Sequence, residues 1–350
     1  MPVCNLFPQG KMRIEKSMNK QAPLLVLAPM AGITDWPFRR QAMLHGADKT
    51  VTEMISAMGL LQAPRGNIAY QHLLSYDESE TNLTAQIFGK DPDFMAEAAA
   101  ILSALPQYTG LDINFGCPAP KVTSSGSGSA LMKDIPRARA IIAAVRKTCA
   151  KPLSAKMRIG WDSHSINAVD FAKMCEDEGV DSLCVHGRTR AQQYSGRADW
   201  GQIALVKQSV SIPIIANGDV FSAADALVIL NQTGADGIAL GRGALGKPWL
   251  FSQIKQALAG EAVSLPDPQQ ALVTALDHLE DMVRMKGERR ALIEMRKHFA
   301  WYLKGTRNAA AARAIINATE ELETLKSVLA RHFLAEDQGT SAGLYNIAMI

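Results

Sequence analysis

The chain has 350 residues, of which 47% are hydrophobic, and its formal net charge is +3. This length suits one large α/β domain with a small second domain, and the hydrophobic fraction is sufficient for a substantial core. The cysteines (Cys4, Cys117, Cys149, Cys175 and Cys184) form no CxxC pair and no Cys/His ligand spacing. The sequence therefore excludes a disulfide framework, predicts no metal site and fits a reduced, cytoplasmic enzyme.

Residues 1–20 carry mixed charges and lack the apolar run of a signal peptide. No later segment is apolar over the length needed to span a bilayer. We therefore expect an N-terminal extension without a role in the fold, and no membrane association.

From residue 21 the chain alternates short apolar runs with longer amphipathic stretches, a pattern typical of repeated βα units around a parallel sheet. We predict eight strands, at residues 24–28, 50–53, 83–87, 111–114, 153–157, 182–186, 213–216 and 237–240. Amphipathic stretches such as residues 91–105, 136–149 and 167–178 are predicted helices between them. Eight such units in about 250 residues predict an α/β fold, a (β/α)8 TIM barrel over residues 21–260. A small all-α C-terminal domain, residues 261–340, is expected to follow.

Active sites of such barrels lie at the C-terminal ends of the strands, so the residues after each predicted strand are candidates. In chain order they are Pro29, Met30 and Ala31, then Glu53 and Met54, Gln86, Asn114 with Cys117, Lys156 with Arg158, His186 with Arg188, Asn217-Gly218-Asp219, and Gly241-Arg242-Gly243. The last two turns follow the seventh and eighth strands, where barrels bind phosphate through backbone N–H groups. Either turn alone could be a tight loop, but together they predict a phosphate-bearing cofactor. No GxGxxG fingerprint follows the first strand, so a Rossmann domain is not supported.

Cys117 is distinctive because Gly116 and Pro118 end the predicted strand on either side of it. A free cysteine is most often a small buried apolar residue, but these rigid neighbours favour a positioned thiol. The Ser/Gly run at residues 124–129 predicts a mobile loop over the strand end. From the residues alone, Lys156 could also be a Schiff-base lysine, and the turn at His186 could simply cap a strand.

Six motifs occur in order along the chain, each at a predicted strand end: Ala-Pro-Met-Ala-Gly-Ile-Thr-Asp (28–35), Asn-Phe-Gly-Cys-Pro (114–118) with Lys121, Lys-Met-Arg-Ile-Gly-Trp (156–161), Val-His-Gly-Arg-Thr (185–189), Ala-Asn-Gly-Asp (216–219) and Gly-Arg-Gly (241–243). They resemble the motifs of the tRNA-dihydrouridine synthase family. The resemblance covers roughly residues 24–305, and the segment at residues 296–303 is similar to the helical C-terminal domain of bacterial members.

The resemblance implies an FMN enzyme that reduces uracil in folded tRNA to 5,6-dihydrouracil, with NADPH as electron donor. It implies flavin contacts from Pro29, Met30, Ala31, Gln86, Lys156, His186, Asn217, Gly218, Asp219, Gly241 and Arg242. Asn114, Lys121, Arg158 and Arg188 would face the substrate, and Cys117 would protonate carbon 5 of the base after hydride transfer to carbon 6. A cysteine with an ordinary pKa, near about 8.5, still carries the proton that a general acid donates at neutral pH. The loop at residues 124–129 has few of the basic or bulky residues seen in some members.

Residues 282–307 carry eight basic residues against two acidic ones, a local balance of +6 in a chain with a net charge of +3. A helix through this segment would place Arg289, Arg296 and Lys304 on one stripe beside Lys297, because they recur at steps of seven and eight residues. An ordinary solvated helix face is the alternative. Because flavin chemistry does not require the appended domain, contact with RNA phosphates is the better hypothesis.

Two other functions stay open from the sequence. One is a small-molecule flavin oxidoreductase of the dihydroorotate dehydrogenase kind, which would not need a basic C-terminal domain. The other is an RNA-binding barrel without activity, against which Cys117, Lys156 and His186 speak. The sequence does not determine which uridine is reduced, whether the RNA is tRNA or another structured RNA, or whether NADPH or NADH is used. We expect a monomer.

Overall fold

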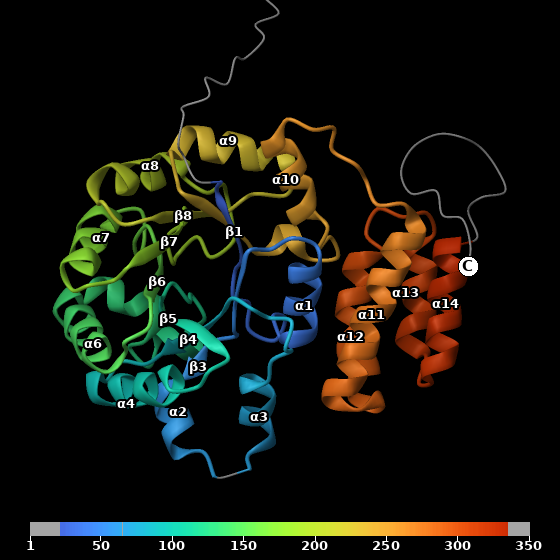
Figure 1. Ribbon diagram of the computed structural model, residues 1–350, viewed down its shortest axis with the longest axis horizontal. Helices are drawn as coiled ribbons and strands as arrows, with labels where there is room; N and C mark the ends of the chain where they lie inside the picture. Colours follow the sequence, from blue (N-terminus) through green and yellow to red (C-terminus); the bar gives the residue numbers. More distant parts are fainter. Residues whose placement is uncertain (1–21, 65, 335–350) are drawn as a thin grey trace, which may run out of the picture.

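The computed structural model describes residues 22–64 and 66–334. Within them the chain forms a barrel of strands surrounded by helices, with a bundle of four helices against one side of it (Figure 1). The predicted N-terminal extension, residues 1–20, and the last six residues of the predicted C-terminal domain lie outside the described residues. No described helix combines the length and the apolar character needed to cross a membrane.

Eight parallel strands form the closed barrel, and they pair in the ring order β1, β2, β4, β5, β6, β7, β8 and β9, with β9 returning to β1. Their bounds are β1 Leu24–Leu27, β2 Lys49–Val51, β4 Leu83–Phe88, β5 Tyr108–Phe115, β6 Leu153–Arg158, β7 Ser182–His186, β8 Ile214–Asn217 and β9 Gly237–Leu240. The predicted (β/α)8 barrel with C-terminal helices is therefore confirmed.

A ninth strand, β3 (Ile55–Ser56), was not expected; it pairs with the end of β4. The predicted second strand was too long, because regular pairing of β2 stops at Val51. At Thr52 the hydroxyl accepts a hydrogen bond from the N–H of Gln86 and donates one to the carbonyl of Glu53. The Thr52 side chain thus interrupts the regular ladder between β2 and β3.

In the part of the chain that the structure describes, ten α-helices lie around the barrel: α1 Trp36–Leu44, α2 Ala57–Gln62, α3 Ile68–Leu74, α4 Pro92–Ser103, α5 Pro120–Thr123, α6 Ile135–Thr148, α7 Ala168–Asp177, α8 Trp200–Ser209, α9 Ala223–Thr233 and α10 Leu250–Ala259. Two short 3-10 helices, η1 (Gly128–Lys133) and η2 (Arg242–Ala244), follow β5 and β9. The bundle consists of α11 Pro268–Lys286, α12 Glu288–Tyr302, α13 Ala309–Ala318 and α14 Leu322–Leu334. The predicted boundary at residues 260 and 261 falls between α10 and α11.

The barrel and the bundle have separate hydrophobic cores that meet at the loop after β9. Trp249 precedes α10 but belongs to the core of the bundle. Nearby, a Cβ atom on Gly246 would lie 2.3 Å from the backbone carbon of Trp301 in α12. Glycine is needed here because the backbones of the two parts approach so closely.

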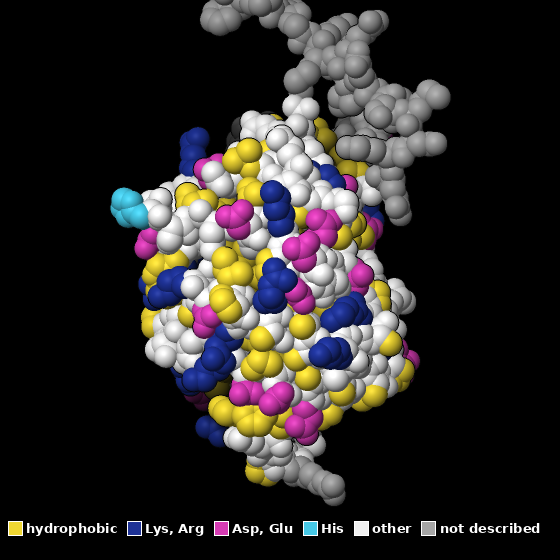
Figure 2. All heavy atoms as spheres, turned by 90° about the vertical axis from the view of Figure 1, so that its left-hand side faces the viewer, with side chains coloured by type: hydrophobic (Ala, Val, Ile, Leu, Met, Phe, Trp, Pro, Cys, Tyr) yellow, Lys and Arg dark blue, Asp and Glu magenta, His cyan; other side chains and the backbone are white. Residues whose placement is uncertain are grey.

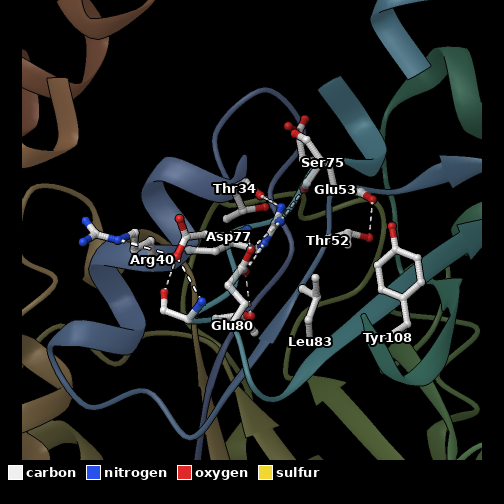
Figure 3. Close-up of polar contacts among 12 residues, drawn as sticks. Thr34, Arg40, Thr52, Glu53, Ser75, Asp77, Glu80, Leu83 and Tyr108 are labelled. Carbon is white, nitrogen blue, oxygen red and sulfur yellow. Dashed lines mark hydrogen bonds and ion pairs between the residues drawn. The ribbon is translucent and has the colours of Figure 1, made fainter. Parts of the chain in front are cut away.

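A buried ion pair between Arg39 and Glu80 fixes the segment before β4 against α1 (Figure 3). Arg39 Nε lies 2.6 Å and its Nη2 lies 3.0 Å from the two carboxylate oxygens, and neither side chain is more than 1% exposed. Further hydrogen bonds reach the carbonyls of Thr34 and Ser75, the hydroxyl of Thr50 and the N–H of Asp77. Such additional partners offset the desolvation of a buried ion pair, so α1 is anchored next to the end of β1.

Two histidines and a phenylalanine meet where α1 packs against the bundle. The Phe38 ring centroid lies 5.7 Å from those of His278 and His298, which are 4.5 Å from each other. Burial lowers the pKa of His278 to about 4 and the pKa of His298 well below its usual range. Both imidazoles are therefore neutral in the folded protein at neutral pH.

We expect the free energy of unfolding to fall as the pH drops from about 6.5 towards 4, because only the unfolded chain binds protons at His278 and His298 there. From about pH 7 to about pH 5.5, each imidazole should contribute a loss of about 1 kcal/mol. Urea unfolding at the two pH values measures this loss. A His278→Gln/His298→Gln variant should show a flatter pH dependence; an unchanged dependence would contradict the assignment.

Candidate active site

A cavity of about 620 Å³ opens at the C-terminal ends of the barrel strands. This volume is typical of a site for a small molecule or cofactor. Most of the predicted site residues line it: Pro29, Met30, Ala31, Gln86, Asn114, Cys117, Lys156, Arg158, His186, Asn217, Gly218, Asp219, Gly241 and Arg242. Because the barrel is closed, the C-terminal ends of its strands meet around one cavity, and residues far apart in the sequence line it together.

A chain of hydrogen bonds inside the barrel runs from β6 to the turn that carries Cys117. Asp112 accepts hydrogen bonds from the Ser154 hydroxyl, at 2.6 Å, and from Gln86 Nε2, at 2.7 Å. The other end of the Gln86 amide, Oε1, accepts one from Asn114 Nδ2 at 2.8 Å. Burial raises the pKa of Asp112, while the hydrogen bonds from Ser154 and Gln86 oppose that shift. The carboxylate thus sets the orientation of both amides.

The Asn114 side chain in turn shapes the backbone at Cys117. Its Oδ1 accepts hydrogen bonds from the N–H groups of Gly116 and Cys117, at 3.0 and 2.9 Å. Arg158 Nε donates to the Gly116 carbonyl at 2.8 Å, and the N–H and hydroxyl of Ser129 donate to the Cys117 carbonyl. Cys117 itself is half-buried at the cavity. Hydrogen bonds to both its N–H and its carbonyl therefore fix the backbone of Cys117, and with it the position of the thiol.

The Ser/Gly run after Cys117 lies over the strand end, as predicted, but its last residues are helical rather than part of a loop. Gly128 and Ser129 already belong to η1, and the side chains of Ser127 and Ser129 are buried. The hydrogen bonds from Ser129 to Cys117 explain the difference, because they fold the run back onto the strand end. Lys121 is exposed on α5 and is not among the residues that line the cavity.

Lys156 on β6 and His186 on β7 both face the cavity. In the pairing of these strands Lys156 lies opposite Cys184, and His186 lies opposite Arg158. Burial lowers the pKa of Lys156, with a further lowering contribution from Arg158. Burial also lowers the pKa of His186 well below its usual value, and the cations at Lys156 and Arg158 add to this effect. His186 is therefore a neutral imidazole, which offers a hydrogen bond without a full charge.

Asp219 lines the cavity and forms an ion pair with Arg188, which is not among the lining residues. The Asp219 carboxylate pairs with Arg188 Nη2 at 2.8 Å and with Arg242 Nη2 at 3.4 Å. Arg188 is only 2% exposed, and it also donates to the carbonyls of Ser195 and Gly196. Arg188 thus holds the loop after β7, while Asp219 orients Arg242 at the rim of the cavity.

Sequence reasoning missed two exposed aromatic residues at the cavity, Tyr194 and Phe221. The Arg242 guanidinium lies 4.9 Å from the Tyr194 ring centroid and 5.7 Å from that of Phe221. It also missed the role of Asp112, although alternation along the strand places that residue on the same face as Asn114. Tyr194 and Phe221 lie in irregular segments, so no periodic signal could have indicated them.

The predicted basic stripe of the C-terminal domain is only partly formed. Gly287 interrupts the helix between α11 and α12, and α12 ends at Tyr302, so Lys304 does not belong to it. Arg289 and Lys304 are exposed and Arg296 is half-buried. Lys297 instead donates a hydrogen bond to the carbonyl of Gly32 in the loop between β1 and α1. The prediction of one helical stripe ending at Lys304 was therefore wrong.

Comparisons with known proteins find similarity to one family. A sequence model described as "Dihydrouridine synthase (Dus)" matches residues 26–337. The "Probable tRNA-dihydrouridine synthase" of Rickettsia conorii is 41% identical over 310 residues, which cover 88% of this chain and 93% of that protein. The "tRNA-dihydrouridine synthase B" of Pseudomonas aeruginosa is 39% identical over 324 residues, which cover 91% of this chain and 95% of that protein.

The chain belongs to the dihydrouridine synthase family. The family membership suggested by the six strand-end motifs is thus confirmed. Each of the six motifs contributes at least one residue to the lining of the cavity. This cavity is therefore the candidate active site of this dihydrouridine synthase family member. Among the described residues, no group of three or more His, Cys, Asp or Glu side chains is arranged to hold a metal ion.

Replacing Asn114 by Ala should lower the free energy of unfolding by about 1–3 kcal/mol, because the N–H groups of Gly116 and Cys117 lose their acceptor. Chemical denaturation measures the loss. Asn67→Ala is the matched control, since it also removes an acceptor for two backbone N–H groups, but at the exposed start of α3, and should cost at most about 1 kcal/mol. Equal losses in the two variants would show that Asn114 does not support the Cys117 turn.

Proposed function

We propose that this protein is an FMN-dependent tRNA-dihydrouridine synthase that reduces uridines in folded tRNA to 5,6-dihydrouridine, with NADPH as electron donor. The observation that carries the proposal is the position of Cys117, held at one cavity with Asn114, Arg158, Lys156 and His186. This arrangement supports the proposal because it brings a thiol and polar groups that could hold a base into the same cavity as residues suited to a flavin. The relatives named above, described as tRNA-dihydrouridine synthases, support the choice of tRNA as substrate.

The residues of the cavity fit FMN by shape and by chemistry. A Cβ atom on Gly218 would lie 2.8 Å from the Cβ of Ala198, so the turn after β8 leaves no room for a side chain. Arg242 supplies a cation beside the glycine turns, which suits a phosphate group. Pro29, Met30 and Ala31 provide an apolar surface for the flavin ring. Gln86, Lys156, His186 and Asn217 provide polar groups at the strand ends, although Asn217 Nδ2 also donates to the carbonyl of Ala239.

When bound, the flavin supplies the hydride that adds to carbon 6 of the uracil, and NADPH restores its electrons. Cys117 donates its thiol proton to carbon 5, where the negative charge of the base develops. Asn114 and Arg158 orient the base beside that thiol. The Asn114 side chain also fixes the backbone of Cys117, so proton donor and substrate are positioned by one residue.

The C-terminal bundle is the proposed RNA-binding domain. Arg289 at the start of α12, Arg296 and Lys304 remain available to phosphates at least in part, since none of their side chains has a hydrogen bond or ion pair with another described residue. The opposite side of the barrel is a poorer candidate, because basic and acidic side chains alternate there without a continuous basic area (Figure 2). A small-molecule flavin oxidoreductase would have no use for the bundle cations, so RNA binding discriminates between the two functions.

Replacing Cys117 by Ala should lower the rate of uridine reduction by roughly 10² to 10⁴, the usual contribution of a positioned general acid. FMN content and NADPH oxidation should stay near those of the unchanged protein, because neither needs the thiol. Mass spectrometry of dihydrouridine in tRNA after incubation with the variant measures the first effect. Normal reduction by the Ala variant would rule out Cys117 as the proton donor.

Changing Arg289, Arg296 and Lys304 to Glu should weaken tRNA binding strongly and reduce the slope of log affinity against log salt by about 2–3. Filter binding at several salt concentrations measures both quantities. A variant with Arg139, Lys147 and Lys173 changed to Glu has the same net charge but alters α6 and α7, so it is the control for net charge. It also removes the ion pair of Arg139 with Glu178, so its fold is checked by circular dichroism. If both variants lose affinity equally, net charge rather than a bundle surface governs binding.

A further inference from the structure

The loop between β1 and α1 belongs at once to the active-site cavity and to the interface with the bundle. Met30, Ala31 and Ile33 line the cavity. Within the loop, the Thr34 hydroxyl donates to the Met30 carbonyl and accepts from the Met30 N–H. The N–H groups of Ile33 and Thr34 donate to that same carbonyl. The loop is therefore a compact turn whose shape defines one wall of the cavity.

Gly32 forms the tip of this turn, and charged side chains from two sides hold its backbone. Its N–H donates to a carboxylate oxygen of Glu53, which follows β2 in the barrel. Its carbonyl accepts from Lys297 Nζ on α12, a residue 265 positions away in the sequence. Gly32 adopts φ +74°, a conformation that L side chains rarely adopt, so the turn depends on external support as well as on glycine.

A second link from the bundle holds the end of the same loop. Lys286, the last residue of α11, lies 2.6 Å from Asp35 and 2.7 Å from Glu294, and Asp35 and Lys286 are almost fully buried. Asp35 occupies the N-cap position of α1 but makes no capping hydrogen bond there. Its carboxylate is instead directed to Lys286, so this interaction replaces the usual function of an aspartate at a helix start.

We propose that Lys297 is a positioning residue for the flavin-binding loop, and that through it the RNA-binding bundle forms one structural unit with the flavin site. The inference rests on the proposed function of the cavity. Lys297 does not contact RNA; it holds the Gly32 carbonyl and, together with Lys286 at Asp35, keeps residues 29–35 in the conformation that lines the cavity. An RNA bound to the bundle would thus contact the same structural unit that forms one wall of the cavity, the cavity in which a base of that RNA is reduced.

Hydrogen–deuterium exchange of the flavin-free protein tests the positioning role directly. In Lys297→Met, the amides of residues 30–35 should exchange about tenfold faster, because the turn loses a charged donor. Lys297→Arg keeps a cationic donor and should restore slow exchange. Arg313→Met is the matched control, since Arg313 is exposed on α13 and its side chain has no hydrogen bond or ion pair with a described residue. Unchanged exchange of residues 274–285 in α11 shows that each variant is folded.

FMN titration by fluorescence and tRNA binding separate this role from an RNA contact. We expect Lys297→Met to bind FMN about tenfold more weakly while its tRNA affinity and salt slope stay unchanged. Normal exchange of residues 30–35 in Lys297→Met, or a loss of tRNA affinity with normal FMN binding, would overturn the inference. If the unchanged protein bound no FMN, the proposed function would fail, whereas the exchange measurement would still decide whether Lys297 holds the loop.

Discussion

The carboxylate of Asp112, enclosed inside the barrel, is the interaction on which the candidate active site depends. An ionised carboxylate without partners would be too costly to bury, so its oxygens must be hydrogen-bonded. Ser154 and Gln86 meet this requirement, and the Gln86 amide then has only one orientation in which both of its ends are satisfied. That orientation determines the direction of Asn114, and Asn114 determines the backbone of the Cys117 turn.

The polar groups in the cavity thus form one connected network. In a buried network of this kind each side chain restricts the orientation of its neighbours. The loss of one hydrogen bond therefore affects more groups than it would at the surface. Lys156 and His186 stand beside the same network, and their lowered pKa values have the same origin in burial. The barrel supplies rigid strand ends, while the turns after them supply the groups that meet a ligand.

The bundle is attached through polar groups as well as through its hydrophobic core. Lys286 at Asp35 and Lys297 at Gly32 join it to the loop after β1, and Arg40 reaches Asp281 at 2.9 Å. The Phe38 contacts with two histidines complete this interface. An ion pair forms only when its two side chains meet in a suitable geometry. These pairs therefore define the orientation of the bundle against the barrel more strictly than apolar contacts alone would.

The sequence by itself determined the barrel and the residues that stand at its strand ends. Buried strands and their turns are local features, so the strand order and the strand-end residues, among them Asn114, Cys117, Lys156 and His186, could be predicted from alternation and turn chemistry. The roles of Asp219 and Lys297 could not. Their partners come from segments far along the chain, and only the folded arrangement shows that Asp219 binds Arg188 and that Lys297 reaches Gly32. A basic residue on a helix has the same pattern whether it faces solvent or a neighbouring domain; packing alone makes that choice.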